Sequence, residues 1–177
     1  MRVSELDYDL DAMKTQIRPA RESDAATILG FIRELAEFEK LAHEVVGTEE
    51  KLRQHLFGAK PVAETLIAEV DGKPAGFALF FTSFSTFLAQ PGIYLEDLFV
   101  KPEFRSHGLG KKLVGELARI TVERGYGRLE WSVLDWNTRA WDFYRSLGAV
   151  SKDEWTQARL SGEALKTLAV EASENAR

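Results

Sequence analysis

Apolar and polar positions along this chain follow two short-range patterns, one repeating about every 3.6 residues and one about every second residue. The first is typical of helices with one buried face, and the second is typical of strands. In chain order they predict a strand at 15–20, a helix from 23 to about 41, a helix at 48–58, strands at 65–70, 73–81 and 93–100, a helix at 108–123, a strand at 128–134, a helix at 138–147, a strand pair over 149–160, and a helix at 162–170. This order predicts a single α/β domain.

Individual residues mark the ends of several of these elements. Ser23 is a predicted N-cap, and Asp71-Gly72 is a two-residue hairpin signal between two strands. Gly125 is expected just past the end of a helix, where a left-handed residue is favoured. Residues 82–92 carry no strand pattern, so we expect a loop there that exposes aromatic side chains.

Length and composition agree with one folded domain. The 177 residues are 45% hydrophobic and 29% charged, which is ordinary for a globular protein of this size. We expect a domain at 16–170, a leader at 1–15 and a tail at 171–177. The chain shows no secretory signal and no run of about 18 apolar residues, so we expect a cytoplasmic protein that does not bind membranes.

Charge and cysteine content exclude several classes of function. The net charge of −5 argues against a general nucleic-acid binder, which usually carries a basic excess. The absence of cysteine excludes disulfides, thiolate metal sites and a cysteine nucleophile. The three histidines have no spacing that suggests a metal site, so we expect no metal.

The segment from Tyr94 to Lys112 carries the strongest chemical signal. Gly108 and Gly110 precede a predicted helix, and helix N-termini bind phosphates through unpaired N–H groups. Arg105 and Lys111 add positive charge to this loop. The spacing fits neither the Walker pattern nor the dinucleotide fingerprint. A plain glycine turn into a core helix remains the alternative.

Two adjacent carboxylates interrupt the apolar strand at 93–100. Strict alternation places Tyr94, Glu96, Leu98 and Val100 on one face and Leu95, Asp97 and Phe99 on the other. Whichever carboxylate faces the interior should have a raised pKa and could act as a base near neutral pH. A structural salt bridge is the alternative. Glu39 falls on the apolar face of the predicted helix from 23 to 41, where a carboxylate must be paired, protonated or at the edge of a cavity. A residue at the helix end that already faces water is the alternative.

A third signal follows the strand predicted at 128–134. Asn137 is well placed as an N-cap, and Tyr144 lies on the apolar face of the following helix. A buried tyrosine hydroxyl needs a partner or opens on a cleft, although an ordinary core tyrosine is the alternative.

Taken together, these residues resemble the GNAT superfamily of N-acetyltransferases. The acidic strand followed by Arg105, Gly108 and Gly110 matches its acetyl-CoA signature, and the segments 17–20, 38–39, 94–100 and 133–149 resemble diamine acetyltransferases of the spermidine/spermine or thialysine type. The resemblance implies the GNAT fold, with a mixed central sheet flanked by helices. The residues Ser85-Thr86 and the Gly162-Glu163-Ala164 tail are more similar to the thialysine subgroup.

The resemblance also implies a reaction and a set of site residues. An acetyl group would pass from acetyl-CoA to a primary amine of a small cationic substrate, directly in a ternary complex. Glu96 would act as base and Tyr144 as acid. Cofactor-binding positions would be Leu98, Phe99, Val100, Arg105, Ser106, His107, Gly108, Leu109, Gly110, Lys111, Asn137, Arg139 and Ala140. Substrate-binding positions would be Phe38, Glu39, Glu96, Asp97, Asp153, Glu154 and Trp155.

Two other functions remain open at this level. One is acetylation of a protein or peptide amine, and the other is CoA binding without catalysis. Relatives of this type imply a homodimer.

Overall fold

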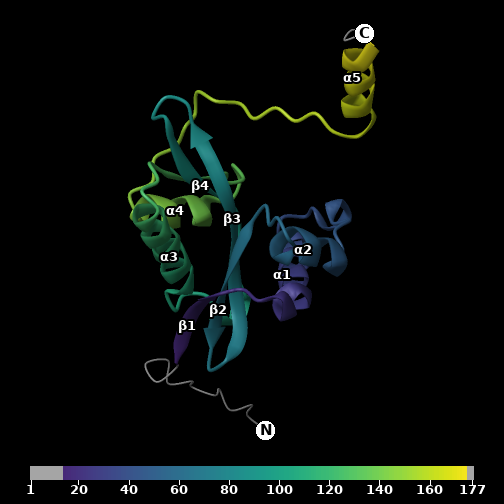
Figure 1. Ribbon diagram of the computed structural model, residues 1–177. Coiled ribbons are helices and arrows are strands. Elements are labelled where there is room, and N and C mark those ends of the chain that lie inside the picture. The colour runs from purple at the N-terminus through teal and green to yellow at the C-terminus, as the bar shows by residue number, and fades with distance from the viewer. Residues whose placement is uncertain (1–13, 175–177) are drawn as a thin grey trace. The chain divides into compact units, whose positions relative to one another are not determined.

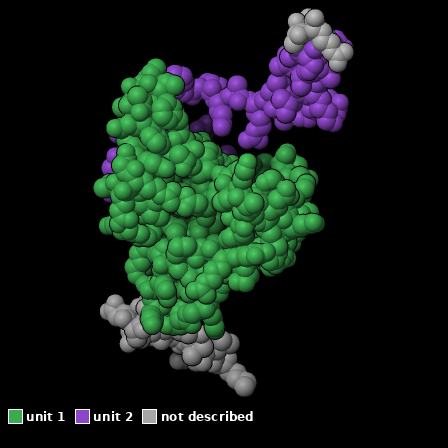
Figure 2. Space-filling model, in the orientation of Figure 1, with its two compact units in different colours: residues 1–132 green, residues 133–177 purple. Residues whose placement is uncertain are grey.

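The computed structural model describes residues 14–174, and the chain divides into two compact units, one ending at Ser132 and one beginning at Val133 (Figure 2). Residues 1–13 of the predicted leader and 175–177 of the predicted tail lie outside the described residues. Within the described part, no helix is long and apolar enough to span a bilayer.

The first unit is built on a five-stranded mixed sheet in the order β1-β2-β3-β4-β5 (Figure 1). Its strands are β1 Thr15–Pro19, β2 Glu64–Val70, β3 Lys73–Ser85, β4 Gln90–Val100 and β5 Leu129–Trp131. Neighbours from β1 to β4 are antiparallel, and β5 is parallel to β4. The predicted α/β class and mixed sheet are confirmed.

The two hairpins differ in how well the sequence predicted them. Asp71 and Gly72 have φ of 49° and 74°, which confirms a tight turn with left-handed residues between β2 and β3. The predicted loop at 82–92 is wrong, because β3 continues to Ser85 and β4 begins at Gln90. Backbone pairing from Thr82 opposite Ile93 to Ser85 opposite Gln90 extends the hairpin where the side-chain pattern gives no signal.

Helices cover both faces of this sheet. Helices α1 (Ala25–Phe38) and α2 (Glu49–Phe57) lie on one face, and α3 (Leu109–Glu123) lies on the other (Figure 1). On the α1 side the Phe31 ring stacks on Phe77 of β3 at 5.5 Å. The buried residues of the α3 side are aliphatic except for Phe80, and they include Leu109, Leu113, Leu117, Ala68, Ala78 and Leu95.

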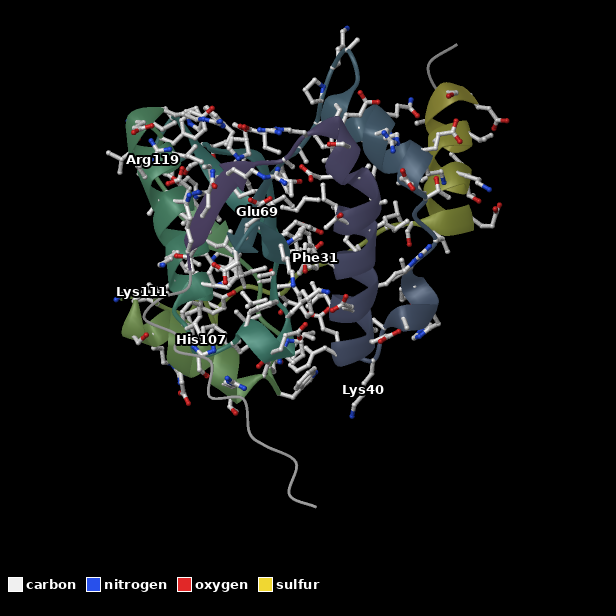
Figure 3. The ribbon with its side chains drawn as sticks, turned by 90° about the horizontal axis from the view of Figure 1, so that it is seen from below. Phe31, Lys40, Glu69, His107, Lys111 and Arg119 are labelled. Carbon is white, nitrogen blue, oxygen red and sulfur yellow. The ribbon has the colours of Figure 1, made fainter. Side chains whose placement is uncertain are left out.

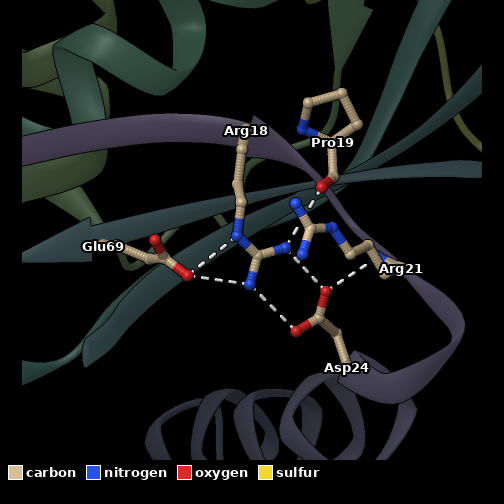
Figure 4. A network of polar contacts seen from close by, with 5 residues as sticks. All are labelled: Arg18, Pro19, Arg21, Asp24 and Glu69. Carbon is tan, nitrogen blue, oxygen red and sulfur yellow. Dashed lines mark hydrogen bonds and ion pairs between the residues drawn. The ribbon is translucent and has the colours of Figure 1, made fainter. Parts of the chain in front are cut away.

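The start of α1 is fixed by an ionic network rather than by the predicted Ser23 cap (Figure 4). A short 3-10 turn, Glu22–Asp24, precedes the helix. The Asp24 carboxylate accepts hydrogen bonds from the Arg18 guanidinium at 2.7 and 3.0 Å and from the Arg21 N–H at 2.7 Å. Arg18 also donates to Glu69 of β2 at 2.8 Å. The hydrogen bonds from Arg18 hold the pKa of Asp24 below its usual value.

Helix α1 ends at Phe38, earlier than the predicted Leu41. Lys40 has φ 62°, and the N–H groups of Lys40 and Leu41 bond back to the carbonyls of Glu37 and Ala36 at 3.1 and 2.8 Å. This is the Schellman pattern, which turns the chain out of the helix. Glu39 is therefore the C-cap residue of α1.

The second unit contains α4 (Thr138–Ser146) and α5 (Gly162–Glu174). The predicted strand pair at 149–160 is wrong, because these residues form no strand and nearly all their side chains are exposed. A segment with strand propensity forms a β-strand only when it can hydrogen-bond to a neighbouring strand, and none of the described strands pairs with this segment. The strand predicted at 128–134 is shorter than expected, since β5 pairs only with Ile93–Leu95 of β4.

Candidate active site

Glu96 forms a bulge in the middle of β4. Leu79 lies opposite Asp97 and the next residue, Phe80, lies opposite Leu95, so Glu96 has no residue across from it on β3. An inserted residue of this kind reverses the inward and outward order of the strand beyond it.

The bulge makes the predicted face assignment of β4 wrong. Leu95 packs in the α3-side cluster, and so do Leu98 and Val100, which strict alternation placed on the other face. Phe99 lies 4% exposed in the α1-side cluster. A side-chain pattern with period two cannot reveal a bulge, because the inserted residue is itself polar and exposed.

The two strand carboxylates have different surroundings. Glu96 is exposed, whereas Asp97 is largely buried. Burial, together with the negative charges of Glu96 and Glu39, raises the pKa of Asp97 to about 6. Burial also raises the pKa of Glu39, at the end of α1. Among the described residues none of these three carboxylates has an ion-pair partner, which disfavours the salt-bridge alternative.

The edge of β4 that faces away from β3 is open beyond Leu95. The Lys101 N–H bonds Ala75 of β3 at 2.9 Å, so alternation turns the polar backbone groups of Phe99 toward β3 and those of Leu98 and Val100 toward this edge. Described strand pairing on this side ends at Leu95. A ligand with amide groups can therefore pair with the backbone of Leu98 and with the N–H of Val100, whose carbonyl already accepts from Arg105, but not with Phe99.

The predicted phosphate loop leads into α3. Ser106 and Gly108 have φ of 69° and 74°, and the first bond of the helix joins the Lys112 N–H to the Gly108 carbonyl at 2.9 Å. The N–H groups of residues 109–111 thus have no acceptor within the helix. Figure 3 shows His107 and Lys111 at this end of α3. Leu109 is 1% exposed, so only its backbone can serve a ligand. This arrangement fits the pyrophosphate of a CoA molecule.

Arg105 makes contacts that the sequence did not reveal. Its Nε donates to the Val100 carbonyl at 2.8 Å. Its guanidinium lies over the Phe38 ring at 5.3 Å and over the Phe99 ring at 5.6 Å. The structure thus brings predicted cofactor-side and substrate-side residues into direct contact.

The remaining predicted residues belong to the second unit. Asn137 is the N-cap of α4, and its side chain accepts from the Ala140 N–H at 3.2 Å, as predicted. Tyr144 is 8% exposed, and burial raises its pKa to about 12. Arg139 is exposed on the same helix. Asp153, Glu154 and Trp155 lie exposed in the irregular segment before α5.

Within residues 14–174 no group of three histidine, aspartate or glutamate side chains could hold a metal ion.

Comparisons with known proteins decide the family. The model of the acetyltransferase (GNAT) family matches residues 30–149. The chain belongs to this family, and it is an acetyltransferase. It is 42% identical to the thialysine N-epsilon-acetyltransferase of Bos taurus over 86% of this chain and 96% of that protein. It is 31% identical to the L-ornithine N5-acetyltransferase NATA1 of Arabidopsis thaliana, over 88% of each chain.

A solved structure agrees with the GNAT fold. An integron cassette protein from V. cholerae superposes with a TM-score of 0.73 at 26% identity, covering 88% of this chain and 97% of the other.

Proposed function

We propose that this GNAT protein transfers the acetyl group of acetyl-CoA to a primary amine of a small cationic substrate, with thialysine-like amino acids preferred over polyamines. The observation that carries the proposal is the group of unpaired carboxylates, Glu39, Glu96 and Asp97, beside the open edge of β4. An ammonium ion is attracted to such a group because the negative charges are partly buried. Two similar proteins are named for acetylation of the side-chain amine of thialysine and of ornithine, which supports this substrate class.

The chain's own residues suggest how the transfer would proceed. An amine with a pKa near 10 is an ammonium ion at neutral pH and has no lone pair for attack. Glu96, exposed at the bulge, would receive the proton of the ammonium ion through a water molecule. Asp97 would place a second negative charge beside Glu96. The Leu98 N–H, on the open edge, would polarise the thioester carbonyl. The nitrogen bonds to the acetyl carbon as the carbon–sulfur bond breaks, and it then gives up a second proton, which balances the proton that the departing thiolate takes. No acetylated protein side chain is needed.

Tyr144 is our candidate for the acid that protonates the departing thiolate. With a pKa of about 12, its hydroxyl keeps its proton throughout the neutral range. We expect Tyr144→Phe to lower kcat by about 10²-fold, at the low end of general-acid effects because a thiolate leaves readily. Steady-state rates with saturating acetyl-CoA measure this, and Asp142→Asn, at an exposed position of the same helix, is the control. Unchanged turnover in Tyr144→Phe removes the assignment.

A thiol-release assay tests the proposed function. Acetyl-CoA is offered with thialysine, lysine, ornithine, putrescine, spermidine, spermine and a lysine-containing peptide. Faster release with thialysine than with the polyamines or the peptide supports the proposal. Release only with the peptide overturns the substrate class but not the chemistry. No release with any amine, while acetyl-CoA still raises Tm, favours the CoA-binding module.

We also propose a homodimer. The β3–β4 hairpin exposes Phe84 (62%), Phe87 (92%) and Leu88 (52%), and a contiguous apolar set is unusual on a monomer surface. Light scattering should report about twice the 19.9 kDa of one chain. A mass of one chain at assay concentration contradicts the proposal, and Phe87→Ser should weaken the dimer while Val122→Ser, on the exposed face of α3, should not.

A further inference from the structure

Arg105 connects three segments, and one of them, the end of α1, is distant from the other two in the sequence. Its backbone belongs to the loop before α3, its Nε–H is bonded to the last residue of β4, and its guanidinium covers Phe38 at the end of α1. Phe38 is 43% exposed, so the cation covers part of a ring that otherwise faces solvent.

The contacts continue from Arg105 into the core. Phe99, under the guanidinium at 5.6 Å, lies 6.0 Å from the Phe31 ring, which in turn stacks on Phe77. Phe99, Phe31 and Phe77 are 4% exposed or less. The inner side of Arg105 therefore rests on a rigid support, whereas Phe38 lies on the last turn of a helix that ends one residue before Glu39.

We propose that Arg105 is a positioning residue for the amine substrate. It clamps Phe38 to the end of β4 and thereby sets the place of Glu39 relative to Asp97 and Glu96. The inference rests on the proposed function and deepens it, because it assigns to a residue of the phosphate loop control over amine binding. It differs from the expectation that Arg105 serves the phosphates of CoA.

The geometry explains why lysine cannot replace this arginine. A guanidinium is planar, so it lies flat on a ring while its Nε–H points to a carbonyl in the same plane. A lysine keeps the charge but has neither the flat face nor a donor at that position. A role in binding phosphate through charge, by contrast, is largely retained by lysine.

The kinetic test uses Arg105→Lys and measures KM for each substrate. We expect KM for the amine to rise about tenfold, because the variant loses one charge-assisted hydrogen bond and a cation–π contact. KM for acetyl-CoA should stay within about twofold. A rise confined to acetyl-CoA, or wild-type values for both, overturns the inference. Arg119→Lys is the matched control, since Arg119 is exposed on α3 and its ion pairs among residues 14–174 are with Glu116 and Glu123 on its own helix.

A double-mutant cycle separates the clamp from a general loss of structure. Phe38→Leu removes the ring at the other end of the contact. If Arg105 acts through Phe38, kcat/KM for the amine in the double variant should be about equal to that of the less active single variant, because both substitutions remove the same contact. Strictly additive losses in kcat/KM for the amine would show that the two residues act separately.

A measurement without turnover tests the clamp if no amine is acetylated. Hydrogen exchange of the amides of residues 36–41 should be about tenfold faster in Arg105→Lys than in the wild type, because the end of α1 loses its anchor. Exchange in α3 should not change. Equal exchange at 36–41 overturns the clamp whatever the substrate, whereas faster exchange without acetylation of any amine overturns only the proposed function.

Discussion

Glu96→Gln should lower kcat/KM for the amine about 10³-fold, because a positioned base contributes typically 10²–10⁴-fold. Glutamine has nearly the same shape but cannot accept the ammonium proton. Because Glu96 is exposed at a bulge and has no residue across from it, the substitution should leave the fold intact. Acetyl-CoA should therefore raise Tm of the variant as it does for the wild type. A wild-type rate in Glu96→Gln would remove the proposed base.

The pH profile supplies the second half of this prediction. With its pKa at about 6, Asp97 becomes protonated as pH drops through that value and loses its attraction for the ammonium ion, so kcat/KM for the amine should fall there. Asp97→Asn should remove this inflection. Glu96→Gln should move it to lower pH, because one of the charges that raise the pKa of Asp97 is gone. Glu50→Gln, on the exposed side of α2, should leave the profile unchanged.

Asp24→Ala should lower the free energy of unfolding by about 3 kcal/mol, the low end of the cost of removing one partner from a buried ion pair. Arg18 would keep Glu69 and the Pro19 carbonyl as acceptors but lose its other carboxylate, and the N–H of Arg21 would lose its acceptor. Both Arg18 and Asp24 have side chains less than one-fifth exposed. Chemical denaturation at neutral pH measures the difference.

The effect should depend on pH in a defined direction. The pKa of Asp24 is lowered in the folded state, so its stabilising contribution is present above the unfolded value near 3.8 and is lost as pH falls through the folded value. The gap between wild type and Asp24→Ala should therefore close in acid. Glu116→Ala is the control, because Glu116 pairs with Arg119, which is more than half exposed, and should cost less than about 1 kcal/mol. Equal losses at the two sites would contradict a special role for the network.

Sequence patterns predicted the elements that local chemistry determines. Left-handed backbone occurs at Gly108 and at the Asp71-Gly72 turn, and the side chain of Asn137 caps α4. The amphipathic helices were also found, because their buried faces repeat over several turns. The pair of carboxylates and the phosphate loop were likewise visible as residue types at fixed spacing.

What the sequence could not predict depends on contacts between distant segments. The bulge at Glu96 appears only when β4 is aligned with β3, and it decided that Asp97 rather than Glu96 is the buried carboxylate. The network of Arg18, Asp24 and Glu69 joins residues up to 51 positions apart, so no local signal marks it. The contact of Arg105 with Phe38 is of the same kind. The strand pair predicted at 149–160 is wrong for the opposite reason. A local pattern favours strands there, but none of the described strands pairs with the segment.

The bulge at Glu96 has a consequence for how such a protein can diversify. A residue within a regular ladder is constrained by the side chain across from it, and a change there must be compensated. Position 96 has no such neighbour on β3. Mutations at this one position can therefore change the charge presented to the substrate at little cost in stability. The proposed base is thus held in place by function alone, so descendants of this chain can lose acetyl transfer through a single substitution there, while the sheet that supports the site is inherited unchanged.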